Sequence, residues 1–85
     1  MSDELYPQIR HILRQHARLP VNADTVGCHT DLFAAGMSSH ASVSVMLALE
    51  AQFGLEFPDA MLKREVFMSI DAMAAALSSL QGQAA

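Results

Sequence analysis

Two serines, Ser38 and Ser39, stand immediately before an apolar segment with helical spacing, and Gly36 precedes Ser39 by three residues. A serine at such a place can cap the helix, because its hydroxyl accepts a backbone hydrogen bond. It can also carry a phosphate ester, because the free N–H groups and the positive dipole end of a helix N-terminus stabilise an anion. The glycine lets the backbone approach closely and leaves the serine on the surface. The residues alone leave both roles open.

Other chemistries find little support. A hydrolytic serine needs a Gly-x-Ser-x-Gly turn mounted on a strand, and the chain has no such turn. The four histidines lack the spacing of metal ligands, and the single cysteine is best interpreted as a small filler of a loop. We therefore expect no catalytic residue and no metal site, and we expect His40 to point away from Ser39. The residues concerned are His11, His16, Cys28, His29 and His40.

Composition narrows the class of protein further. The chain has 85 residues, a formal net charge of −4 and only five Lys or Arg, so we expect one small domain, 1–85, without a nucleic-acid surface. No apolar run approaches the roughly 20 residues that span a bilayer, so no membrane partner is expected. One cysteine cannot form an internal disulfide, and the acidic start does not resemble a signal peptide. We expect a cytoplasmic protein that is monomeric on its own.

The elements that must position the serines are helical. Leu5, Ile9, Ile12 and Leu13 have helical spacing and predict a first helix over about 3–17. Residues 19–38 contain several helix breakers and predict a long connection, which at this length is usually functional.

The second half of the chain predicts three more helices. One runs from about Ser39 to Phe53 and stops at Gly54, and a short one covers 59–64 after Pro58. Ser69 caps a last helix that ends near Leu80 and buries one edge, and the tail 81–85 should fray. That buried edge consists of Ile70, Met73 and Leu77.

The helix that follows the serines is apolar on more than one side. Val45, Leu49 and Phe53 form one row that should face the core, whereas Val43 and Leu47 form a second row, rotated around the helix. The second row either meets a partner or is buried by a small bundle, and periodicity does not decide between them.

The run Asp31–His40, followed by the pattern Leu49–Pro58, resembles the phosphopantetheine attachment site of acyl and peptidyl carrier proteins. Phe33 takes the place of that family's apolar anchor, Gly36 that of its glycine and Ser39 that of its modified serine. The resemblance implies an all-α, four-helix bundle with a long loop between helices one and two and a short third helix. It implies a carrier without enzymatic activity, because the chemistry belongs to the cofactor and to partner enzymes.

The same resemblance assigns roles to residues. Phosphopantetheine is expected on Ser39, with Ser38 as the nearest competitor, and Gly36, Met37, Ser38 and His40 are expected around the cofactor. A phosphopantetheinyl transferase would attach it. Partner enzymes would contact the second helix and the segment after it, at Val43, Leu47, Glu50, Phe57 and Met61.

Several positions depart from the fatty-acid carriers, which usually have an aspartate before the serine and more acids along the second helix. Here the matching positions are neutral, and Glu50 is the single acid between Ser38 and Phe53. His40 replaces a common leucine, and Lys63 with Arg64 adds positive charge near the short helix. A dedicated role is therefore favoured over housekeeping fatty-acid synthesis. The neutral positions are Ser38, Ala41, Ser44, Ala51 and Gln52.

The runs 32–39, 46–50 and 57–62 are similar to a bacterial group of small stand-alone carriers that includes aminoacyl carrier proteins. That likeness implies an amino acid:carrier protein ligase, resembling a class II aminoacyl-tRNA synthetase, as the loading partner. Two alternatives stay open: an acyl carrier of a specialised lipid or polyketide pathway, and a structural helical module in which Ser39 is only a cap.

Overall fold

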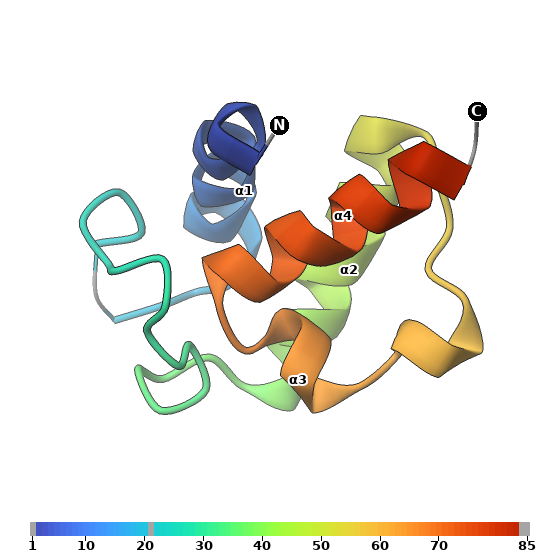
Figure 1. Ribbon diagram of the computed structural model, residues 1–85. Helices are drawn as coiled ribbons and strands as arrows, with labels where there is room; N and C mark the ends of the chain where they lie inside the picture. The colour runs from blue at the N-terminus through green and yellow to red at the C-terminus, as the bar shows by residue number, and fades with distance from the viewer. Residues whose placement is uncertain (1, 21, 84–85) are drawn as a thin grey trace.

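Helices make up all the regular structure in the computed structural model, which describes residues 2–20 and 22–83 (Figure 1). The four α-helices of this part are α1 (Ser2–His16), α2 (Ser39–Phe53), α3 (Arg64–Phe67) and α4 (Ile70–Gln83), and a 3-10 helix, η1, covers Asp59–Met61. The predicted all-α class is confirmed. Within the same residues, no helix has the combination of length and apolar character needed to cross a bilayer.

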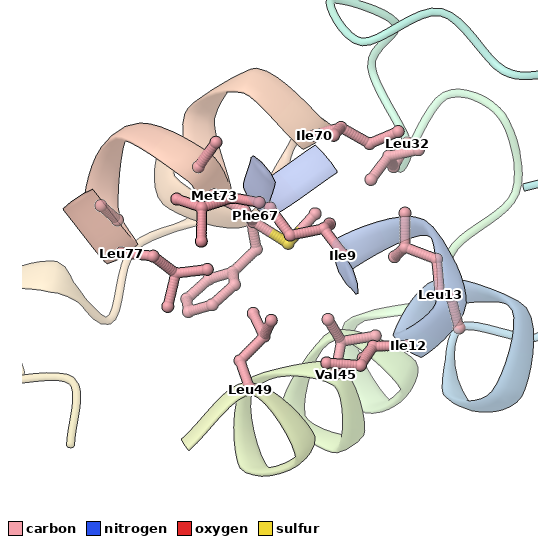
Figure 2. Close-up of a cluster of buried hydrophobic side chains, with 14 of the residues drawn as sticks. Ile9, Ile12, Leu13, Leu32, Val45, Leu49, Phe67, Ile70, Met73 and Leu77 are labelled. Carbon is pink, nitrogen blue, oxygen red and sulfur yellow. The ribbon is translucent and has the colours of Figure 1, made fainter. Parts of the chain in front are cut away.

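One apolar core lies where α1, α2 and α4 meet (Figure 2). The four apolar residues whose spacing predicted the first helix are buried in α1, and so are Val45 and Leu49 of α2 and the predicted edge of α4. Phe53, which was expected to continue the α2 row, is only partly buried and packs at the margin of the core. The largest fully buried side chains are Ile9, Leu13, Leu32, Val45, Leu49, Ile70, Met73 and Leu77.

Helix ends follow the local signals closely at α2 and α4. Gly54 adopts a left-handed conformation with φ of 63°, and its N–H donates to the Glu50 carbonyl, which ends α2 where predicted. The Ser69 hydroxyl accepts a hydrogen bond from the Ala72 N–H at 3.0 Å, as its predicted cap role requires. α4 continues to Gln83, so residues 81–83 are helical where fraying was expected, and 84–85 lie outside the described residues.

The short helix predicted over 59–64 is wrong in its bounds. Leu62 ends η1 with φ of −83° and ψ of 65°, and Lys63 is extended with φ of −127° and ψ of 152°, so no helix can pass through these two residues. α3 begins after this break and ends at Phe67, which is buried. The window 59–64 therefore contains the whole of η1 and the first residue of α3.

The connection between α1 and α2 lies along one side of the bundle and is tied to it at several points. One guanidinium nitrogen of Arg10, in α1, donates hydrogen bonds to the carbonyl oxygens of Ala23 and Val26, at 2.9 and 2.7 Å. Further along, the Leu32 N–H donates to the Met68 carbonyl, and the Asp71 N–H to the Cys28 carbonyl, at 2.6 and 2.9 Å. This long loop thus has fixed partners on both α1 and the start of α4.

Candidate functional site

The two serines at the start of α2 have different roles. Ser38 is the N-cap: its backbone is extended, and its hydroxyl accepts a hydrogen bond from the Ala41 N–H at 3.0 Å. Ser39 is the first residue of the helix and is exposed. The interpretation of Ser39 as a cap is therefore wrong, because its neighbour takes that hydrogen bond. The Ser39 hydroxyl is left available to solvent.

A tight turn presents the serines. The Asp31 carboxylate accepts hydrogen bonds from the N–H groups of Phe33 and Ala34, and the Met37 N–H donates to the Leu32 carbonyl at 2.9 Å. Leu32 and Met37 are both buried, so each end of the turn is anchored in the core. Met37 was expected beside the cofactor; its position makes it a packing residue instead.

Gly36 is required by the geometry of this turn. Its φ is +122°, a region that side-chain-bearing residues rarely adopt, and a Cβ built there would lie 2.7 Å from Cδ of Pro20. The glycine of the sequence motif therefore permits a close approach between the two ends of the long loop.

Replacing Gly36 with alanine should lower the free energy of unfolding by about 1 to 3 kcal/mol, since backbone strain adds to the contact with Pro20. Gly54→Ala is the matched control, because Gly54 also has positive φ but nothing within 4 Å of its Cβ position. Chemical denaturation of both variants measures the difference. An equal loss in the two would mean that the approach to Pro20 is unimportant.

A groove of about 530 Å³ opens beside Ser39, between α2 and the segment that leads into α3. Its charged lining residues are Lys63 and Arg64, and no acidic side chain lines it. The Arg64 guanidinium lies 4.2 Å from the centre of the Phe33 ring, a distance typical of a cation–π contact. Phe33, expected to be an anchor, therefore also positions a cation at the groove. The apolar lining consists of Phe33, Val43, Met46, Leu62 and Phe67.

The predicted second row of α2 is exposed. Val43 and Leu47 are 50% and 55% exposed, so the bundle does not bury them. Leu62 is 47% exposed on the other side of the groove and was missed by the sequence reasoning, because it falls in a window interpreted as helix. His40 follows Ser39 in α2 and is exposed.

Three residues predicted to contact partners have contacts within the domain. Phe57 is only 6% exposed and packs edge-on against Phe67, with ring centres 5.3 Å apart. The Glu50 carboxylate accepts a hydrogen bond from the Phe57 N–H at 2.8 Å, which ties the end of α2 to the following segment. Met61 is partly buried against the core at the end of η1. Because Phe57 is buried, it is a core residue and not the surface contact that was predicted.

The serines, the turn and the groove form a surface suited to a tethered anionic group. A phosphate ester on Ser39 would meet the N-terminus of α2 and the two cations of the groove. An extended organic chain attached to that phosphate could lie against the apolar side chains of the groove. The residues present therefore fit phosphopantetheine.

Comparison with known proteins agrees with this geometry. The family model of the phosphopantetheine attachment site matches residues 8–77. An aminoacyl carrier protein of Agrobacterium fabrum (strain C58) is 49% identical over 65 residues, which cover 76% of this chain and 78% of that relative. The chain therefore belongs to the phosphopantetheine-binding carrier proteins, and within them to the aminoacyl carrier proteins. Its cofactor is phosphopantetheine, and it is a carrier rather than an enzyme.

Solved structures give the same result. The chain matches a carrier protein from Agrobacterium tumefaciens in the crystal structure of its complex with an engineered Bradyrhizobium japonicum glycine:carrier protein ligase and ATP, with a TM-score of 0.85 and 43% identity over 88% of this chain and 97% of that one. A solution structure of an A. tumefaciens protein matches with a TM-score of 0.72 and 41% identity, over 94% and 99% of the two chains. The predicted four-helix carrier fold is confirmed.

Proposed function

We propose that Ser39 carries the phosphopantetheine and that the arm holds a small amino acid, with glycine as the first candidate. The observation that carries the proposal is the difference between the two serines at the start of α2. Ser38 makes the cap, which leaves the exposed Ser39 hydroxyl available. The similarity to a carrier seen in complex with a glycine:carrier protein ligase supports the choice of cargo.

Attachment is a phosphoryl transfer in which the Ser39 oxygen is the nucleophile. Its oxygen forms a bond to the pantetheine phosphorus of coenzyme A, the bond to the departing adenosine bisphosphate breaks, and the hydroxyl proton passes to a base of a phosphopantetheinyl transferase. The N-terminus of α2 stabilises the anionic product. The attached group then supplies a thiol that forms a thioester with the amino acid.

The remaining contribution of the chain is recognition. Val43 and Leu47 lie one and two turns beyond Ser39 on the exposed side of α2 and offer apolar contacts close to the attachment point. A tethered cargo is delivered at a high effective concentration once a partner binds there. We propose that a ligase of the glycine:carrier protein type docks on these two residues, in the reducing cytoplasm that a chain with one free cysteine suits.

The loading experiment tests the cargo. The protein is incubated with coenzyme A, Mg²⁺ and a broad phosphopantetheinyl transferase, and then with a glycine:carrier protein ligase, glycine and ATP. Intact-mass analysis should show two successive increases, one for each group. A malonyl transferase of fatty-acid synthesis should load the modified protein poorly, because the exposed side of α2 lacks the acids that basic partner patches recognise.

The outcomes separate the alternatives. No first mass increase would favour the structural module, and a first increase followed by efficient malonyl loading would favour the lipid carrier. Absence of the second increase with glycine, but its presence with another amino acid, would change the cargo and keep the class.

A further inference from the structure

The groove beside Ser39 carries positive charge only. Both of its charged lining residues, Lys63 and Arg64, are cations. The nearest carboxylate in sequence to the Phe33 ring, that of Asp31, accepts hydrogen bonds from two backbone N–H groups and does not line the groove. Glu65 is exposed and also lies outside the lining.

The two cations differ in their contacts. Arg64 stacks on Phe33, whose ring itself lines the groove, so its charge is kept beside the apolar surface. Lys63 precedes α3 in an extended conformation, and no ion pair involves it within the described part of the chain. Both positive charges can therefore interact electrostatically with a group bound in the groove.

An unloaded pantetheine arm suits this environment. Its phosphodiester is anionic and complements the cations, and its chain of methylenes and neutral amides can cover Val43, Met46 and Leu62. The groove volume of about 530 Å³ lies within the range of roughly 300 to 1,000 Å³ common for small-molecule sites.

An amino acid changes the charge at the far end of the arm. Thioester formation consumes its carboxyl group and leaves its α-amino group, which is largely an ammonium near neutral pH because α-amino groups titrate at about 7.7 to 8.0. Inside the groove this ammonium would lie near Lys63 and Arg64 with no carboxylate in the lining, and like charges repel. The neutral thiol of the unloaded arm meets no such repulsion.

Resting on the proposed attachment at Ser39, we propose that this groove holds the arm while it is unloaded and releases its end when an amino acid is attached, through repulsion by Lys63 and Arg64. The charge of the cargo thereby decides whether the arm lies on the carrier or extends toward a partner. A loaded carrier is thus distinguishable from an unloaded one by the position of its arm.

The test compares three arms attached to Ser39 from coenzyme A analogues: the free thiol, an acetyl group and a glycyl group, the last two linked as stable amides. Acetyl and glycyl differ by the ammonium alone. Methyl NMR of Val43, Met46 and Leu62 reports groove occupancy relative to the unmodified protein. The thiol and acetyl arms should shift these signals, and the glycyl arm should occupy the groove about tenfold less.

Charge variants of Lys63 test the contribution of one of the two groove cations. Lys63→Gln leaves the Arg64–Phe33 stack intact and should return part of the glycyl arm to the groove, and Lys63→Glu should return more. Arg18→Gln, which removes an exposed cation that does not line the groove, should change nothing.

Mass spectrometry of each modified protein comes first, so that failure of attachment counts against Ser39 and not against this inference. With all three arms in place, equal groove shifts from acetyl and glycyl would overturn the inference. Absence of groove shifts from every arm would overturn it as well.

Discussion

Replacing Ser39 with alanine is expected to abolish phosphopantetheine attachment while changing the free energy of unfolding by no more than about 0.5 kcal/mol, since the side chain is exposed and makes no cap. Intact mass after incubation with coenzyme A, Mg²⁺ and a phosphopantetheinyl transferase measures attachment. Thermal unfolding measures stability in the same samples.

Ser38→Ala is the matched control and should show the opposite pattern. It removes the hydroxyl that accepts from the Ala41 N–H, so the free energy of unfolding should fall by about 0.5 to 2 kcal/mol and the Tm by several degrees. Attachment should continue at temperatures where the variant is folded. Modification lost in Ser38→Ala and kept in Ser39→Ala would move the site by one residue.

A second pair of substitutions on α2 separates docking from stability. Leu47→Ala should weaken binding to the loading ligase by about 1 to 2 kcal/mol, or roughly five- to thirty-fold in Kd, and leave the Tm almost unchanged, because Leu47 is 55% exposed. Leu49→Ala, two residues further on, should instead cost about 2 to 5 kcal/mol of stability, because Leu49 is fully buried among α1, α2 and α4.

Binding of the holo protein by calorimetry and unfolding by denaturant measure the two effects. The Leu49 variant is compared at a temperature where circular dichroism shows it folded. Undiminished ligase binding by Leu47→Ala would remove this residue from the docking surface, and a large loss of stability in the same variant would mean that it packs on the bundle.

How far the sequence predicts this fold depends on how local the signal is. Both bounds of α2 were predictable, because a serine pair and a glycine mark them within a few residues of the apolar rows. The interval from Pro58 to Phe67 was not, because the break at Lys63 carries no glycine or proline to announce it. Its conformation is set by the burial of Phe67 and by its connection to α4, which are tertiary effects.

The site, like the fold, depends partly on local signals and partly on tertiary contacts. The resemblance to carrier proteins, aligned on Gly36, predicted attachment at Ser39, but the assignment of the cap to Ser38 requires knowing which hydroxyl reaches the Ala41 N–H. The role of Phe57 depends on a hydrogen bond from its N–H to Glu50, seven residues earlier, and no periodic pattern contains that information. The stacking of Arg64 on Phe33 joins residues 31 positions apart and is likewise invisible in the sequence.

The loop that leads to Ser39 is bound to Arg10, to Met68 and to the first turn of α4, and it enters the core at Leu32 and Met37. If the arm is attached to Ser39, as proposed, these contacts fix its attachment point relative to Val43 and Leu47, the proposed docking residues of α2. A fixed attachment point sets a common limit of reach. Every partner enzyme that docks on the same face must place its reacting atoms within one arm's length of that point. Two enzymes that share this carrier thus share a geometric requirement even where their folds have nothing in common.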